Sequence, residues 1–287
     1  GMFKPNEKIR LRFVNASAMS FYDVRIPNLK MTVVSADGQP VKPVAVDEFR
    51  IGTAETYDVI VEPKGGHYQI EAESIDRAGD AIGTLHNELN PMTHGIHMPA
   101  PRPRSLLTME DMGHGEQHDM SHDTHSSQTM QTATSEHDQH AQHDMHASHN
   151  AMSGTNQPHQ PVEGWANMST PAGHKALQYQ DLKALTPQPD TRAAERELVI
   201  RLGGTMERYI WTMNGKKFSD AEPLQVKYGE RIRLKFINDS MMAHPMHLHG
   251  MFMQLENGQS AANMPNKHTV IVPPGKTVTT LLTADEL

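Results

Sequence analysis

The chain contains an internal repeat, and this repeat limits the fold more than any other feature of the sequence. Residues 4–17 read KPNEKIRLRFVNAS, and residues 227–240 read KYGERIRLKFINDS. In both copies apolar residues alternate with basic ones, which is the period of a half-buried β-strand. Each strand is entered through a turn and ends in Asn-x-Ser, which is typical of a turn. The repeat therefore predicts two related β modules.

A second pair of segments matches downstream of the repeat. Residues 50–62 (RIGTAETYDVIVE) align with residues 271–283 (IVPPGKTVTTLLT), and each is a turn that leads into an alternating strand. Many short strands, turn residues between them and no long amphipathic helix indicate β-sandwiches. We therefore predict an all-β fold of two β-sandwich modules in tandem.

The two copies differ in what surrounds the matched segments. Residues 196–218 predict two strands before the repeat of copy two, whereas copy one begins almost on its repeat. Residues 65–85 continue copy one past its second matched segment, and copy two stops before any equivalent. We therefore expect both modules to be incomplete and the chain to be a fragment of a longer protein.

A segment of different composition separates the two modules. Residues 109–160 are mainly His, Met, Asp, Ser, Gln and Thr, with almost no aliphatic or aromatic residues. Such a segment cannot bury enough apolar surface to offset its chain entropy, so we expect it to be disordered. A short helix is expected at 174–185, before Pro187 and Pro189. The expected organisation is a first module at 1–100, a low-complexity Met/His-rich linker at 101–190 and a second module at 191–287.

Composition excludes several classes of function. A net charge of −8 argues against nucleic acid as the main partner, because phosphate binding needs a basic surface. No run of about 18 apolar residues predicts a membrane span, and the first residues have neither the charged nor the apolar region of a signal peptide. The chain has no cysteine. Disulfides, zinc–thiolate sites and a thiolate copper site are therefore excluded within this chain.

Three closely spaced histidines mark the candidate metal site. Residues 241–249 (MMAHPMHLH) align with residues 18–26 (AMSFYDVRI) of copy one. The three histidines of copy two, His244, His247 and His249, take the positions of Phe21, Val24 and Ile26. Ligand-type residues at the core-type positions of a shared scaffold indicate a site built into one copy.

Strand geometry divides this histidine triplet. Residues two apart share a face of a strand, so His247 and His249 should project together, whereas His244 should point away from them. Imidazole suits Zn, Cu, Fe and Ni, and neighbouring thioethers favour Cu(I). Copper is therefore the preferred metal, because methionines surround the triplet at Met241, Met242, Met246, Met251 and Met253. The structural alternative is a set of core histidines with packing methionines.

The linker carries further candidate ligands for copper. Imidazole and thioether groups on a flexible chain can hold Cu(II) and Cu(I) loosely, because no geometry is imposed in advance. A solvated spacer with incidental metal affinity is the alternative. The linker histidines are His114, His118, His122, His125, His137, His140, His143, His146 and His149. They alternate with Met109, Met112, Met120, Met130, Met145 and Met152.

The triplet also carries a resemblance to a family. HPMHLHG at 244–250 resembles the His-Pro-x-His-x-His-Gly signature of the last cupredoxin domain of multicopper oxidases. VDEFRIGTAETYDVIVEP at 46–63, the stretch at 208–236 and the Met/His-rich linker are similar to the bacterial copper-resistance (CopA-type) branch. The resemblance implies tandem cupredoxin-like Greek-key β-sandwiches, of which the first is the second domain of the oxidase and the last is its C-terminal domain.

The resemblance also implies an activity and roles for the triplet. His244 would be a ligand of type 1 copper, His247 of type 2 copper and His249 of type 3 copper. The whole protein would be periplasmic and would oxidise Cu(I) or similar reductants while reducing dioxygen to water. The type 1 cysteine and the histidines of a first domain would come from segments outside this chain. We therefore expect the chain alone to be inactive as an oxidase.

Two other functions remain open at this stage. A non-enzymatic copper-binding or sequestering protein would use the Met/His-rich linker and the triplet as its ligands. A zinc or iron enzyme of the cupin type would also use His-x-His in a β-barrel, with Glu256 as the acidic ligand beside His247 and His249.

Overall fold

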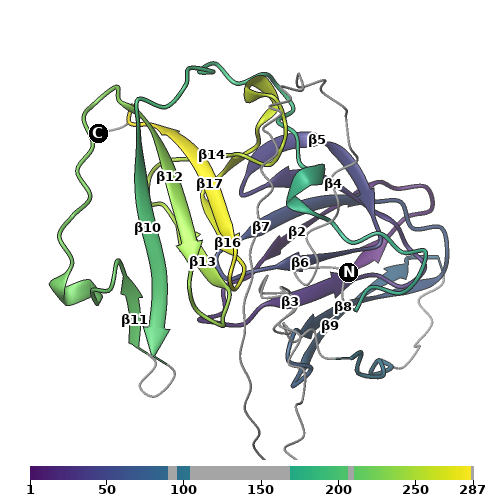
Figure 1. The fold of residues 1–287 in the computed structure, drawn as a ribbon. Helices are drawn as coiled ribbons and strands as arrows, with labels where there is room; N and C mark the ends of the chain where they lie inside the picture. Colours follow the sequence, from purple (N-terminus) through teal and green to yellow (C-terminus); the bar gives the residue numbers. More distant parts are fainter. Residues whose placement is uncertain (90–95, 104–168, 206–209, 286–287) are drawn as a thin grey trace, which may run out of the picture. The chain divides into compact units, whose positions relative to one another are not determined.

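The computed structural model describes residues 1–89, 96–103, 169–205 and 210–285 (Figure 1). The regular elements of this part of the chain are β-strands and three short 3-10 helices. The prediction of an all-β fold is therefore confirmed for the described residues. No helix in the described ranges has the length and apolar character needed to cross a membrane.

The first module is built from two sheets packed face to face. One sheet has the order β1-β9-β8-β3-β6 and the other the order β2-β7-β4-β5. Phe49 on the first sheet and Val33 and Val59 on the second are fully buried between them. The strands are β1 (Met2–Phe3), β2 (Ile9–Val14), β3 (Tyr22–Arg25), β4 (Met31–Ala36), β5 (Gln39–Val46), β6 (Glu48–Ile51), β7 (Thr56–Val61), β8 (His67–Ser74) and β9 (Asp80–Asn87).

The second module combines a six-stranded sheet with a two-stranded one. The larger sheet has the order β11-β10-β12-β17-β14-β15, and the smaller pairs β13 with β16. Ile232, Leu234 and Phe236 of the larger sheet share a core with Val270 and Val272 of the smaller. The strands are β10 (Arg196–Thr205), β11 (Ile210–Met213), β12 (Arg231–Asn238), β13 (His244–His247), β14 (Met253–Leu255), β15 (Asn266–Lys267), β16 (Thr269–Val272) and β17 (Thr277–Thr283).

The sequence repeat is also a repeat of strand pairing. Phe13 of β2 lies opposite Tyr57 of β7, and the aligned residues Phe236 and Val278 lie opposite each other in β12 and β17. The alternation in both copies separates inward apolar side chains from outward basic ones, with Arg231, which is buried, as an exception. The predicted correspondence of the two modules is confirmed at the level of individual residues.

The Asn-x-Ser ending of each repeat forms the same corner in both modules. The buried Asn15 side chain donates to the carbonyl oxygens of Ser20 at 2.7 Å and Ile51 at 3.1 Å. Asn238 donates in the same way to Met242 at 2.7 Å and Val272 at 2.9 Å. One amide thus ties the loop after the strand to a neighbouring strand, which satisfies backbone groups that would otherwise be buried without partners.

The prediction of a short helix at 174–185 is wrong. Only Tyr179–Asp181 form a single 3-10 turn (η1), and the chain on either side is extended. The amide of Leu177 donates to the carbonyl of Glu48 at 2.9 Å, and the side chain of Leu182 is fully buried in the first module's core. These contacts satisfy the chain's polar and apolar groups without a helix, so tertiary packing overrides local propensity. The other 3-10 turns are η2 (Phe218–Asp220) and η3 (Ala261–Asn263).

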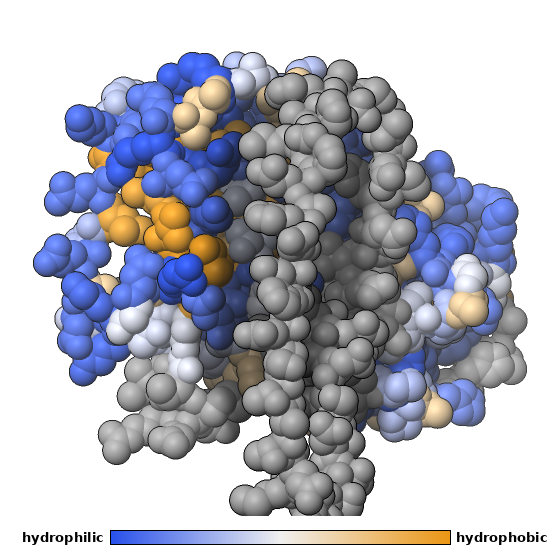
Figure 2. Space-filling model, viewed as in Figure 1, coloured by the Kyte–Doolittle hydropathy of each residue, from blue (hydrophilic) through white to orange (hydrophobic). Residues whose placement is uncertain are grey.

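Large apolar side chains reach the surface of the second module. Figure 2 shows orange, hydrophobic atoms among blue, hydrophilic ones on this part of the surface. Tyr228 is 71% exposed and Leu224 is 52% exposed. The exposed group within the second module comprises Val199, Trp211, Met213, Leu224, Val226, Tyr228, Met241 and Phe252.

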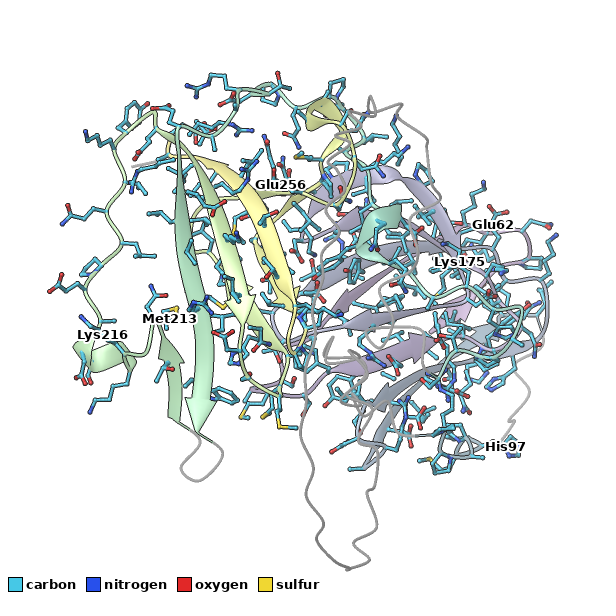
Figure 3. The ribbon with its side chains drawn as sticks, in the orientation of Figure 1. Glu62, His97, Lys175, Met213, Lys216 and Glu256 are labelled. Carbon is cyan, nitrogen blue, oxygen red and sulfur yellow. The ribbon has the colours of Figure 1, made fainter. Side chains whose placement is uncertain are left out.

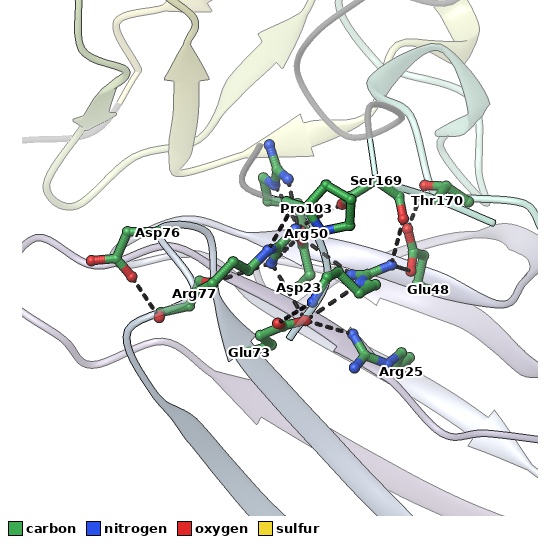
Figure 4. A network of polar contacts seen from close by, with 12 residues as sticks. Asp23, Arg25, Glu48, Arg50, Glu73, Asp76, Arg77, Pro103, Ser169 and Thr170 are labelled. Carbon is green, nitrogen blue, oxygen red and sulfur yellow. Dashed lines mark hydrogen bonds and ion pairs between the residues drawn. The ribbon is translucent and has the colours of Figure 1, made fainter. Parts of the chain in front are cut away.

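A buried network of ion pairs joins side chains of the neighbouring strands β3, β6 and β8 of the first module (Figure 4). Arg50 donates to both oxygens of Asp23, at 2.7 and 3.0 Å, and Arg77 donates to the same carboxylate at 3.0 Å. Arg102 adds an ion pair with Glu48 at 2.6 Å. Because all of these side chains are largely buried, each charge depends on its partners rather than on water.

The same network holds together Pro103 and Ser169, the described residues on either side of residues 104–168. Arg77 donates to the carbonyl of Pro103 at 3.1 Å and to the hydroxyl of Ser169 at 2.7 Å. Arg102 donates to the carbonyl of Ser169 at 3.1 Å, and Thr170 is hydrogen-bonded to the Glu48 carboxylate. Pro103 and Ser169 therefore lie close together on the first module.

Acid should destabilise the first module through this network. Burial alone would raise the pKa of Asp23 and Glu73, but the surrounding arginines hold both below their ordinary values. A carboxyl with a lowered pKa in the folded state stabilises the fold above its unfolded pKa, and this contribution is lost as the pH falls through the folded pKa. We expect the urea midpoint to fall as the pH drops below about 4.5, the ordinary pKa of a glutamate.

The variant Asp23→Asn provides the comparison for this acid effect. It should be less stable than the wild type at pH 6, and its urea midpoint should fall less steeply on acidification, because one titrating carboxyl is gone. An equal slope in both proteins would show that Asp23 makes no contribution to the acid sensitivity.

Candidate metal centre

His244 is positioned by the Asn-x-Ser corner of the second repeat. The Ser240 hydroxyl donates its one hydrogen to Asn238 Oδ1 at 2.7 Å and therefore accepts from His244 Nε2–H at 2.8 Å. Trp211 packs edge-on against the imidazole, with ring centroids 4.8 Å apart. Burial lowers the pKa of His244 and so favours its neutral, ligand-competent form. Because Ser240 occupies Nε2, a metal ion would take Nδ1.

Whereas His244 is held through Nε2, His247 is held through Nδ1. Its Nδ1 lies 2.9 Å from the Thr269 hydroxyl and 3.1 Å from the carbonyl oxygen of His268. In the tautomer whose Nδ1–H donates to these oxygens, Nε2 carries the lone pair that binds a metal. His244 and His247 are thus held by opposite nitrogens, although they stand on one short strand.

The structure divides the triplet as strand geometry predicts. The rings of His247 and His249 lie 4.7 Å apart, centroid to centroid, and both are exposed. His244 instead faces Ser240 and Trp211. At the corresponding positions of the first module, Phe21, Val24 and Ile26 are buried core residues. The histidines thus stand at positions that the sister module uses for packing.

A hollow of about 350 Å³ adjoins His244. Thioethers are prominent in its lining, which includes Met19, Met213, Met242, Met246 and Trp211. A lining of this kind presents soft, polarisable sulfur next to an imidazole, which favours Cu(I) over harder ions. The methionines around the triplet therefore contribute to the surroundings of the site as well as to the core.

A buried ion cluster is linked to His247 through Thr269. Lys267 is fully buried, and its Nζ lies 2.9 Å from Asp37 and 3.3 Å from Glu55. Asp37 also accepts the backbone amide of Thr269 at 3.1 Å. Burial opposes the charge on Lys267, yet the neighbouring acidic groups raise its pKa above the ordinary lysine value. The residue that orients His247 is thus anchored to a carboxylate of the first module.

Lys267 and His268 also lie in this region, but the spacing of the three histidines did not predict them. Lys267 aligns with Val46, which is fully buried in the first module, just as the triplet aligns with core residues. His268 follows it, and its ring lies 5.0 Å from that of His247. Burial lowers the pKa of His268 despite the opposing effect of Asp37. Comparison of the two modules over β15 and β16 would have found Lys267, whereas His268 aligns with Asp47, which is not a core residue.

The structure does not support Glu256 as the acidic ligand of a cupin-type site. The Glu256 carboxylate is bound by Arg233 through two hydrogen bonds, at 2.7 and 2.9 Å. Figure 3 shows Glu256 apart from Met213, which lines the hollow beside His244. The glutamate is therefore a structural ion-pair partner.

The remaining candidate ligands fall outside the described residues. All of the linker histidines and methionines named above lie within residues 104–168. Within the described ranges, no three or more His, Asp or Glu side chains form a group that could hold a metal ion. The triplet thus presents imidazoles from one module without a complete ligand set around any one point in this part of the chain.

Comparisons with known proteins agree on one family. Multicopper oxidase family models match residues 1–91 and 191–287. Copper resistance protein A of Escherichia coli is 44% identical over 100% of this chain and 53% of its own length. A copper resistance protein A homolog of Pseudomonas syringae pv. tomato is 46% identical over 100% of this chain and 52% of its own length. The chain thus spans about half the length of the curated relatives it matches.

Solved structures support the fold. The laccase from Botrytis aclada matches with a TM-score of 0.57 and 16% identity, over 99% of this chain and 48% of that chain. This likeness shows the cupredoxin-type β-sandwich architecture alone. With two family matches and high identity to copper resistance proteins over its whole length, the chain belongs to the multicopper oxidase family, on its copper-resistance (CopA-type) branch.

Proposed function

We propose that this chain is part of a periplasmic copper-resistance oxidase that oxidises Cu(I) or similar reductants and reduces dioxygen to water. The carrying observation is that His244, His247 and His249 replace core residues of the sister module and are held with distinct orientations. The relatives named as copper resistance proteins support the substrate class. Residues 1–100 and 191–287 would be parts of the second and the C-terminal domains.

The donor set fits the copper centres that multicopper oxidases hold, which are of types 1, 2 and 3. We assign His244 to type 1 copper, through Nδ1, because Ser240 occupies its Nε2. His247 goes to type 2 copper through Nε2, and His249 goes to type 3 copper beside it. When bound, copper supplies one-electron transfer from the reductant to dioxygen.

The protein residues have three tasks in this proposal. Ser240 and Thr269 fix the two imidazoles, so that little rearrangement is needed when metal arrives. The methionine-lined hollow favours a soft monovalent ion beside His244. Because the chain has no cysteine, the thiolate that type 1 copper needs would come from another segment of the longer protein. The Met/His-rich linker would collect copper.

Two substitutions test the proposal. They are made in the longer protein, whose remaining residues are read from the coding sequence on either side of this chain. His244→Ala should abolish the blue colour of the copper–thiolate centre. His247→Ala should keep that colour but lose Cu(I)-dependent oxygen consumption, because the electron then has no route to dioxygen. Absorption spectra and an oxygen electrode measure the two effects.

The control is His174→Ala, which removes an exposed histidine outside the triplet. It should keep both the colour and the turnover. Turnover that survives His247→Ala, or a blue colour that survives His244→Ala, would overturn the assigned roles.

A further inference from the structure

A second group of soft metal ligands lies on the first module, outside the triplet. β1, β9 and β8 are neighbours in one sheet, and Figure 1 shows β8 and β9 side by side. The strand register places Met2 opposite His86, and His86 opposite His67. Directly opposed residues share a face of a sheet, so one thioether and two imidazoles stand in a single row across three strands.

This row lies on the outer face of its sheet. Phe3 and Leu85, the sequence neighbours of Met2 and His86, are buried in the first module's core. Because successive residues of a strand point to opposite faces, the row points away from that core. Met2 is 68% exposed, and both histidines are partly exposed. Packing of the hydrophobic core therefore does not explain why these residue types stand together.

The two imidazoles are already close enough to share one ion. His67 Nδ1 and His86 Nδ1 lie 3.1 Å apart, and the ring centroids lie 4.7 Å apart. With metal–nitrogen bonds of about 2.0 Å, this separation corresponds to an angle of about 100° at the metal, close to the tetrahedral value. One ion can therefore replace the proton between the two nitrogens with little movement of either ring.

Thr84 gives His86 the support that metal-binding histidines commonly have. His86 Nε2 lies 3.0 Å from the Thr84 hydroxyl. When Nε2–H donates to that oxygen, Nδ1 carries the lone pair that faces His67. A histidine that donates its far N–H to an oxygen is fixed in both tautomer and ring orientation. On metal binding the His67 proton moves from Nδ1 to Nε2, so the ring stays neutral.

We propose that Met2, His67 and His86 form a binding site for a single Cu(I) ion. Two imidazoles with one thioether are soft ligands, which Cu(I) accepts and harder ions disfavour. In the ranges that the structure describes, no carboxylate completes a three-membered metal group with this pair, so the third ligand is the sulfur.

The test must report on individual histidines, because the linker also offers copper ligands. We would label the full 287-residue chain with diethyl pyrocarbonate under anaerobic conditions, with and without Cu(I), and locate the modified histidines by mass spectrometry. Cu(I) should protect both His67 and His86 from labelling. His86→Ala should abolish the protection of His67, since one imidazole with one thioether no longer holds the ion.

Met2→Leu is the second variant, and it tests the thioether. It keeps an apolar side chain of similar size at an exposed position, so the fold should be unchanged even if His86→Ala fails to fold. Labelling without metal should match the wild type, whereas protection by Cu(I) should be lost. His174→Ala is the matched control and should leave the protection of the pair intact.

Three results would overturn the proposal. These are equal labelling of His67 and His86 with and without Cu(I), protection of His67 that survives His86→Ala, and protection that survives Met2→Leu. Copper held by the linker alone would produce the first of these. The readout does not involve oxygen or turnover, so this inference stands or falls separately from the proposed oxidase function.

Discussion

Lys267→Met should lower the free energy of unfolding by about 3–5 kcal/mol, because it leaves two buried carboxylates without their cation. The Nζ of Lys267 lies 2.9 Å from Asp37 and 3.3 Å from Glu55, and all three side chains are at most 1% exposed. Methionine matches the length and volume of lysine, so the loss would report the charge rather than a cavity. Urea unfolding followed by circular dichroism measures it.

A surface pair supplies the control for this effect. Lys8 and Glu62 form an ion pair at 2.9 Å, but their side chains are 71% and 55% exposed. Lys8→Met should therefore cost about 1 kcal/mol or less. The triple variant Lys267→Met, Asp37→Asn, Glu55→Gln should recover much of the loss, because no buried charge is left unpaired. A Lys267→Met protein as stable as Lys8→Met would show that the buried pairs are not coupled to folding.

This ion cluster links the stability of the fold to the geometry of the site. Asp37 belongs to the first module, yet it accepts the amide of Thr269, whose hydroxyl contacts His247. Tyr179 joins the same cluster by donating to Glu55 at 2.5 Å and accepting the amide of Ile271 at 3.0 Å. The position of one imidazole thus depends on charges from the first module and on the segment that precedes the second.

The sequence predicted the fold well because the repeat carries pairing information. Alternation in β2 and β12 sets which face is buried, and the aligned downstream strands β7 and β17 supply equivalent partners. Strand pairing of this kind depends on local period and on a fixed order of segments. The separation of His244 from His247 and His249 followed from the same two-residue period.

The features that the sequence did not predict depend on contacts between distant segments. Residues 174–185 have a helix-compatible pattern, but Leu177 and Leu182 find apolar partners in the first module, and the backbone pairs there as well. Lys267 can occupy a position that is apolar in the first module only because its ammonium group pairs with Asp37, which is distant in the sequence. Single-segment patterns do not contain such pairings, whereas position-by-position comparison of the two modules does point to Lys267.

Replacing residues 104–168 with a Gly-Ser link of about six residues should keep the fold and remove most of the weakly held copper. The ends of this segment are close together, since Pro103 and Ser169 both bind the Arg77 side chain. A short link can therefore close the gap without strain. Shortening the loop roughly tenfold lowers the entropic cost of bringing its ends together on folding. We therefore expect the free energy of unfolding to rise by about 2 kcal/mol.

A second variant separates the length of this segment from its ligands. It keeps residues 104–168 at full length but changes every histidine and methionine in them to serine. Equilibrium dialysis against copper, followed by a chelator wash, should show the same loss of weakly held copper in both variants. Only the shortened chain should gain stability, because only its loop is shorter. If the shortened chain unfolded at lower urea than the wild type, the segment would have a structural role that the ion network at its two ends does not supply. If the serine variant kept its weakly held copper, that metal would be bound by the two modules rather than by the linker.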